Sequence, residues 1–199
     1  KRNLFKNVDV HHLGPALAYN LLDDSGAIPG KYGKQIIQII SNSLQSNISY
    51  IILSFGEIDI RTQVIHRAVS GGASIAKTAY EIAIRISQFA NILEQQFNIP
   101  ILIWEPVPSS SDQNFSFNPQ FPAVGSEKER NVATYEVALG LRSETLRLQK
   151  QCKAVFCFGA YEKLTRFHET IIEYFSDGCH LNLAGLKVAL TELAALDDK

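Results

Sequence analysis

The chain has 199 residues, of which 46% are hydrophobic, and its formal net charge is −1. This size and composition predict one domain, spanning residues 1–199, with a hydrophobic core. The near-neutral charge and the lack of basic runs argue against nucleic acid or a membrane surface as the main partner. No apolar stretch reaches the ~20 residues that a membrane span requires.

The cysteine usage predicts a reduced, cytoplasmic protein. Cys152, Cys157 and Cys179 are odd in number and lack the spacing of metal ligands. We therefore expect no metal site, and because no glycine-rich phosphate motif is present, we expect no nucleotide cofactor. The sequence contains no Met, so we expect that Lys1 is not the natural start of the protein.

Strands and helices alternate along the chain. Up to residue 97 the predicted elements are a strand at 8–13, a surface loop at 23–33, a helix at 34–44, a buried strand at 50–55 and a long helix capped by Ser74. They are followed by a strand at 99–104, a loop at 109–125, a helix opened by a capping box at 126–129, a strand at 154–158 and a helix at 183–196. This order predicts an α/β fold with a mainly parallel sheet, in which the run 50–55 is central and covered on both faces.

Polar residues follow three of the predicted strands, at the strand ends where ligands bind in a parallel sheet. They are His11, His12 and Gly14 after the first strand, Glu57, Asp59 and Arg61 after the second, and Glu105 after the third. Adjacent side chains of a strand point to opposite faces, so we expect only one histidine, His12, to reach the site. Glu105 is expected to line the pocket, and Asp59 and Arg61 form either a structural ion pair or a substrate contact.

A carboxylate and an imidazole lie close together in sequence near the C-terminus. Asp177 precedes His180 by three residues across a turn at Gly178. Such a carboxylate can fix the tautomer and orientation of a histidine that acts as a general base. The alternative is a helix N-terminus that Asp177 caps, with His180 in solvent.

The chain resembles the SGNH (GDSL-like) hydrolases, which are esterases and acyltransferases with a flavodoxin-like three-layer α/β/α fold. The run Asp-Gly-Cys-His-Leu-Asn at 177–182 resembles the last sequence block of this family, and Gly-Glu-Ile-Asp at 56–59 resembles the third block, G-x-N-D. Gly14 resembles the glycine of the second block, whose N–H helps to bind the oxyanion. The resemblance implies that His180 is the base, that Asp177 orients it, and that Gly14, Gly56 and Asp59 lie at the substrate.

Two features depart from this family pattern. Ile58 replaces the asparagine of the third block, so Arg61 or an imidazole from His11 or His12 would have to supply the missing hydrogen bond. Loss of one oxyanion donor costs ~10²–10³ in turnover. The first block, G-D-S, is absent, and Ser54, which we expect to face the core, is an unsuitable replacement. Ser25 and Ser176 lie in loops without a supporting motif, so we expect the nucleophilic serine on a strand upstream of Lys1.

The resemblance implies an ester hydrolase or O-acyl transferase that acts on a small acyl ester. The segments around Gly14 and Gly56 also resemble a bacterial SGNH-like subgroup that is found near polysaccharide-modifying genes, which suggests an acylated saccharide as substrate. The alternative is a non-catalytic domain that binds a carbohydrate or an acyl group, with the nucleophile and one oxyanion donor lost.

Overall fold

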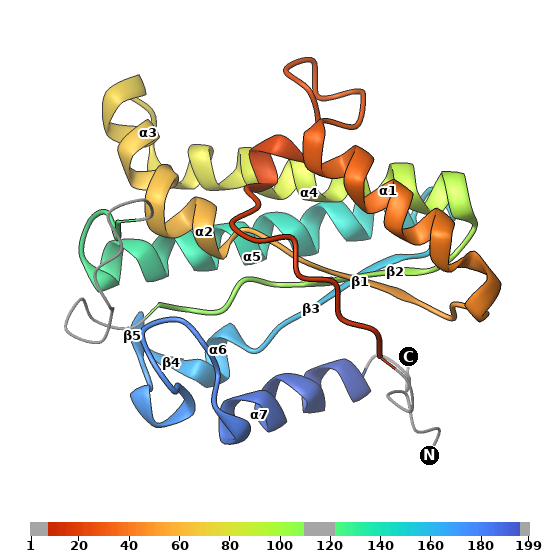
Figure 1. Cartoon of the computed structure of the whole chain (residues 1–199). Helices are drawn as coiled ribbons and strands as arrows, with labels where there is room; N and C mark the ends of the chain where they lie inside the picture. Colours follow the sequence, from red (N-terminus) through yellow and green to blue (C-terminus); the bar gives the residue numbers. More distant parts are fainter. Residues whose placement is uncertain (1–7, 110–121, 196–199) are drawn as a thin grey trace.

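The structure is a computed structural model that describes residues 8–109 and 122–195. Its centre is a parallel sheet with the strand order β1-β2-β3. The strands are β1 (Ile51–Ser54), β2 (Ile101–Trp104) and β3 (Val155–Phe158). Figure 1 shows helices packed on both faces of this sheet. The fold is therefore α/β with three layers, as the alternation of strands and helices predicts.

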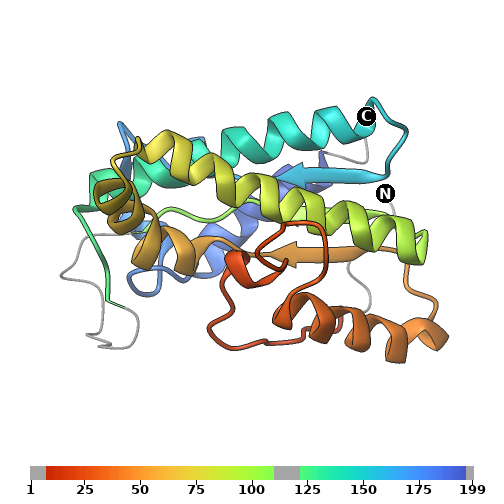
Figure 2. The ribbon, with the colours of Figure 1, turned by 90° about the horizontal axis from the view of Figure 1, so that it is seen from above.

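The two faces of the sheet carry different helices (Figures 1 and 2). One face is covered by α4 (Ile75–Phe97) and α5 (Glu127–Gln149), with α1 (Lys31–Ser43) beside them, and the other by α7 (Leu183–Ala194). Side chains alternate along β2, so Ile101 and Ile103 join the large core under α4 and α5, whereas Leu102 packs with Leu193 of α7.

The long helices begin at the caps that the sequence predicts. The Ser74 hydroxyl accepts a hydrogen bond from the Lys77 N–H, and Ser126 and Glu129 form a reciprocal capping box. The two helices then pack closely, because a Cβ on Gly140 of α5 would lie 2.7 Å from the Cβ of Ala83 in α4. A third cap was not predicted: the Asn182 side chain accepts the first free amides of α7.

A continuous helical run follows β1 and leads away from the sheet edge. It consists of α2 (Glu57–Asp59), a π-helical turn η3 (Ile60–Val64) and α3 (Ile65–Gly71). Gly56, which precedes the run, has a φ of +103° that favours glycine. Its Cα also lies against apolar side chains, since an added Cβ would be 3.6 Å from Pro106.

The shorter elements lie in the loops and at helix ends. They are η1 (Ala18–Asn20), η2 (Leu44–Ser46), α6 (Tyr161–Leu164), the hairpin strands β4 (Thr165–Arg166) and β5 (Glu169–Thr170), and η5 (Ile172–Tyr174). Of the predicted loop at 109–125, positions 110–121 lie outside the described residues, as does position 196 of the last helix. Among the described helices, none is both long enough and apolar enough to cross a membrane.

Two predictions about strands are wrong. Residues 8–13 form no strand, and positions 8 to 12 are exposed. Apolar and polar residues alternate here as in a strand, but a strand also needs a neighbouring strand to hydrogen-bond its backbone. The β1 strand is not covered on both faces: Leu53 is buried, whereas Ile52 is 38% exposed and Ser54 is also exposed, so Ser54 does not face the core. Among the described strands, β1 pairs on one side only.

Candidate active site

The turn that joins η5 to α7 holds Asp177 against His180. The Asp177 Oδ2 atom lies 2.7 Å from the Nδ1 atom of His180, and Oδ1 accepts the backbone N–H groups of His180 at 2.8 Å and Cys179 at 2.9 Å. The Ser176 N–H donates to the His180 carbonyl at 2.9 Å and closes the turn. One carboxylate therefore fixes both the ring and the backbone of the histidine.

The charge on Asp177 is stabilised by these contacts. Burial opposes its ionisation, but the hydrogen bonds from Cys179 and His180 outweigh burial and lower the pKa of the carboxyl. The His180 side chain is 75% exposed. In the part of the chain that the structure describes, no side-chain hydroxyl is hydrogen-bonded to its second nitrogen, Nε2. The ring is oriented from one side and open on the other.

Cys179 shows that this turn lies beside the start of α2. Burial and, to a lesser extent, the carboxylates of Glu57 and Asp177 together raise the pKa of the Cys179 thiol to about 12, while Arg61 lowers it. These electrostatic effects require Glu57 and Arg61 to lie near the turn. Residues 57–61 and the 177–180 turn therefore lie in the same region of the molecule. The thiol itself is poorly suited to be a nucleophile, because it stays protonated near neutral pH.

The acidic residues of α2 have different partners. Arg61 Nε binds the Glu57 Oε1 atom at 2.7 Å, an i,i+4 pair along the helical run. Of the two roles expected for Asp59 and Arg61, an ion pair between them is not found among the described residues, because residues two apart on a helix do not face each other. A substrate contact by Arg61 stays a prediction. Asp59 is fully buried, and its carboxylate turns toward the N-terminal segment.

The N-terminal segment is bound to α2 through Asp59. The Ala18 N–H donates to the Asp59 Oδ2 atom at 2.8 Å, and the Tyr19 N–H donates to Oδ1 at 3.4 Å. Gly14, four residues before Ala18, has a φ of +69°, and its N–H donates to the Nδ1 atom of His12 at 3.2 Å. The Gly14 amide thus lies in an exposed loop and is bound to an imidazole. No contact joins it to His180 among the described residues.

Glu105 has a structural partner. Both of its carboxylate oxygens lie 2.7 Å from the Arg142 guanidinium of α5, which also binds Glu162 of α6. Glu105 is 3% exposed, and a Cβ on Gly159 would collide with it. The residue therefore ties the end of β2 to α5 and α6, and its carboxylate is not open to a ligand.

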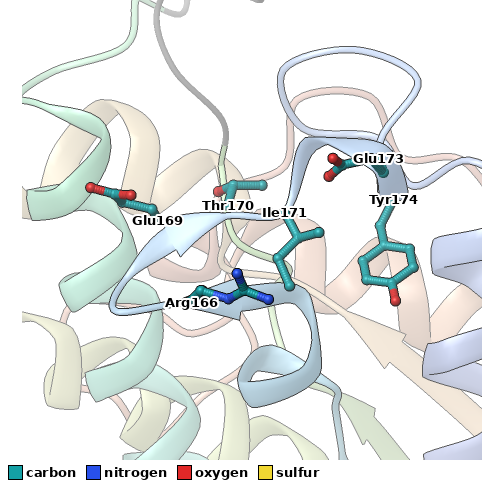
Figure 3. Close-up of a pocket in the computed structure, with 6 residues that line it drawn as sticks. All are labelled: Arg166, Glu169, Thr170, Ile171, Glu173 and Tyr174. Carbon is teal, nitrogen blue, oxygen red and sulfur yellow. The ribbon is translucent and has the colours of Figure 1, made fainter.

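The residues that directly precede the Asp177 turn in the sequence line a hollow of about 470 Å³ (Figure 3). It is lined by Arg166, Glu169, Thr170, Ile171, Glu173 and Tyr174. In Figure 3 the Arg166 side chain extends toward Ile171, whereas Glu169 points away from it. The Tyr174 carbonyl accepts the Asn182 N–H at 2.9 Å, which ties this hollow to the start of α7.

The structure thus brings together some of the predicted residues and separates others. Asp177 and His180 are in contact, and their turn adjoins α2, which Asp59 connects to the Gly14 loop. His11 and His12 are both exposed, and Glu105 is held by Arg142. Glu57 was expected at the end of the second strand, but its place beside Cys179 was not predicted, because no spacing rule relates positions 57 and 179. The residues of the hollow were not singled out from the sequence.

One group of side chains could ligate a cation. Among the described residues, donor atoms of Asp177, Cys179 and His180 lie within 4.8 Å of one another. A cation bound through the Nδ1 atom of His180 would compete with the hydrogen bond between Asp177 and His180. The expectation that the protein works without a metal stays a prediction.

Comparison with known proteins relates the fold to one solved structure. No protein-family model and no curated protein matches the sequence. A solved structure from Streptococcus pneumonia, described as "a putative platelet activating factor", superposes with a TM-score of 0.52 at 16% sequence identity. The match covers 75% of this chain and 59% of the other. At this identity the similarity concerns the architecture alone: the chain shares an α/β/α fold with that protein and spans 59% of its length.

Proposed function

We propose that the protein is an SGNH-type ester hydrolase or O-acyl transferase in which His180 is the general base and Asp177 orients it. The observation that carries this proposal is the 2.7 Å contact between Asp177 Oδ2 and His180 Nδ1, with Nε2 left open. A proton held on Nδ1 by the carboxylate leaves Nε2 as the unprotonated atom, which is the state that a base requires.

The chemistry would follow the order of acyl transfer. Nε2 takes the proton of a hydroxyl nucleophile as its oxygen attacks the ester carbonyl, and Asp177 stabilises the imidazolium that forms. The imidazolium then returns the proton to the leaving alcohol. Water or a second alcohol next attacks the acyl group, which gives hydrolysis or transfer. We expect the nucleophile to be a serine on a segment that the described residues do not include.

The Gly14 N–H is the oxyanion donor that we propose. It donates to the His12 ring at 3.2 Å in an exposed loop, so a developing oxyanion would replace the imidazole as its acceptor. The Ile58 side chain has no donor to add. The proposal therefore depends on a single backbone amide and predicts modest turnover.

An acylated saccharide is the substrate class that we propose. The hollow before the Asp177 turn combines the Tyr174 ring with the polar side chains of Arg166 and Thr170, a combination that suits a ligand rich in hydroxyl groups. The cytoplasm is the compartment that we propose, since Cys152, Cys157 and Cys179 are free thiols.

A second candidate is a non-catalytic domain that binds a carbohydrate or an acyl group. Two observations favour it: Ile58 stands where a side-chain donor is expected, and no described hydroxyl is hydrogen-bonded to His180 Nε2. Under this reading the hollow binds ligand and the dyad only stabilises the turn.

Hydrolysis of p-nitrophenyl acetate separates the two candidates. We expect slow turnover that falls ~10²-fold or more in His180→Ala, the usual contribution of a general base. His66→Ala is the matched control, because His66 is also an exposed histidine and lies on α3. Equal rates for both variants would contradict the enzyme. Saccharide binding without any hydrolysis would support the binding domain.

A further inference from the structure

Asp59 is a buried carboxylate that is hydrogen-bonded to backbone amides of another segment. It is fully buried, and among the described residues it forms no ion pair. Its oxygens accept the N–H groups of Ala18 and Tyr19, which lie about 40 positions earlier in the chain. An aspartate in the first turn of a helix usually binds the free amides of its own helix. Two of the hydrogen bonds of Asp59 hold a separate piece of chain.

These hydrogen bonds join two loops of the candidate site. Asp59 lies three residues after Gly56, which follows β1 closely in the chain, and Ala18 lies four residues after Gly14. The stretch between Gly14 and Ala18 is short and structured, since the Ala16 N–H donates to the Gly14 carbonyl at 2.8 Å. The place of the Gly14 amide is therefore set by the place of Ala18, which Asp59 fixes.

We infer that Asp59 is a positioning residue that holds the Gly14–Asn20 segment against the start of α2, and that its protonation state sets how firmly the segment is held. This inference rests on the proposed role of the Gly14 amide. Asp59 acts through the segment and does not touch the substrate, because it is completely covered.

The charged groups around the segment hold its other end. The Arg67 guanidinium of α3 lies 3.7 Å from the centre of the Tyr19 ring. Arg85 of α4 donates to the carbonyls of Tyr19, Leu22 and Asp23 at 3.2–3.4 Å, and Glu81 acts on the Tyr19 hydroxyl electrostatically. These contacts lie at or after Tyr19. The end that faces Gly14 is held by apolar packing of Leu13 and by the Asp59 carboxyl, its one charged group among these contacts.

The buried position makes this hold sensitive to pH. Burial raises the pKa of Asp59 to about 6, although the amides of Ala18 and Tyr19 and the charge of Arg67 lower it. The neutral carboxyl is therefore favoured while the segment is closed. Release of the segment lets the carboxylate reach water, so opening becomes easier as the pH rises through about 6.

Amide hydrogen exchange measured by NMR tests this inference in the unmodified protein. We expect the protection factors of the Ala18 and Tyr19 amides to fall by up to ~10-fold between about pH 5 and pH 8, because each pH unit between the open-state and closed-state pKa values changes the opening equilibrium about tenfold and only the last unit of that window lies above pH 5. The protection factors of β2 amides should change less. Constant protection at Ala18, or a parallel change in β2, would overturn the inference.

Variants extend the test to the reaction. Asp59→Asn should abolish the pH dependence of Ala18 protection, and Asp23→Asn should preserve it, since Asp23 is less buried and accepts an amide within its own loop. Asp59→Ala should lower kcat for p-nitrophenyl acetate ~10-fold with KM unchanged, because a misplaced donor affects the transition state more than the ground state. Unchanged kcat would refute the positioning role. Absence of hydrolysis by the wild type, with pH-dependent protection intact, would refute the proposed function instead.

Discussion

The Asp177 carboxylate binds the ring and the backbone of His180 at the same time. Oδ2 lies 2.7 Å from the ring Nδ1 atom, and Oδ1 accepts the backbone N–H at 2.8 Å. The imidazole therefore cannot rotate without losing its hydrogen bond to Oδ2, and the carboxylate itself is held in place by the backbone hydrogen bond to Oδ1. Because the side chain is otherwise 75% exposed, this carboxylate is the main determinant of the ring's orientation.

Asp177→Asn should reduce ester hydrolysis ~10²-fold or more, because an amide NH₂ opposite Nδ1 favours the wrong imidazole tautomer. The measurement is kcat for p-nitrophenyl acetate across pH 6–9. Asp24→Asn, a change at an exposed aspartate of a distant loop, is the control and should leave kcat unchanged. Similar rates for the two variants would show that the carboxylate does not orient the base.

The raised pKa of Asp59 predicts in which direction the free energy of unfolding changes with pH. Its pKa is raised from the ordinary 3.8 to about 6 on folding, so the stability that it contributes is fully present below pH 3.8 and is lost as the pH rises through about 6. In urea unfolding, the free energy of unfolding of Asp59→Asn should increase relative to that of the wild type by at most about 3 kcal/mol between about pH 4 and pH 8. If the wild type became more stable relative to Asp59→Asn as the pH rises, the pKa of Asp59 would not be raised in the folded protein.

Arg142→Met should destabilise the fold by about 3 kcal/mol, because it leaves the Glu105 carboxylate buried without its partner. Glu105 has 2% of its side chain exposed in this pair. Lys163→Met removes a cation from the exposed pair with Glu192 and should change the free energy of unfolding by less than about 1 kcal/mol. Equal losses in urea unfolding would mean that Glu105 is not held as the structure shows.

Gly140→Ala should destabilise the protein by about 1–3 kcal/mol, although alanine is the better helix former. The added methyl would lie 2.7 Å from the Ala83 Cβ and 2.9 Å from the Tyr80 ring. Gly71→Ala at the end of α3 meets nothing within 4 Å and should stabilise slightly. Thermal unfolding of both variants measures the difference, and a stabilising Gly140→Ala would argue against the close approach of α4 and α5.

Cys179 should react slowly with iodoacetamide. Burial and the neighbouring carboxylates raise the pKa of its thiol to about 12, so little thiolate forms at pH 8. Mass spectrometry should show Cys152, which is exposed, alkylated much earlier. Glu57→Gln should accelerate the reaction of Cys179, because it removes a nearby negative charge. An unchanged rate in Glu57→Gln would place the turn away from α2.

The sequence was sufficient for the elements whose pattern is local. The helices that begin after Ser74 and Ser126 were predicted with their caps, because a cap and a 3.6-residue apolar period are both local signals. The parallel strands were predicted from apolar runs bounded by helices. The predicted strand at 8–13 failed because its alternation says nothing about whether a neighbouring backbone is present to pair with it.

The candidate site was predictable only where its residues are close in sequence. Asp177 and His180 lie on one turn, and their contact is the one that the spacing indicated. The partners of Asp59 and Glu105 could not be read from the sequence, because both are selected by packing. The pairing of Arg61 with Glu57 is an i,i+4 contact, but no helix was predicted at these positions. For Asp59 the sequence left two roles open, and its burial and hydrogen bonds in the structure decide between them.

The π-helical turn at Ile60–Val64 lets the helical run after β1 absorb a change of length. Such a turn accommodates one residue more than an α-helix would in the same rise. Deleting a single residue there should restore regular α-helix and leave α3 in nearly its present orientation, with Arg67 still over the Tyr19 ring. The same deletion inside α4 would rotate everything beyond it by about 100°, so a one-codon deletion in η3 should be tolerated far better than one in α4.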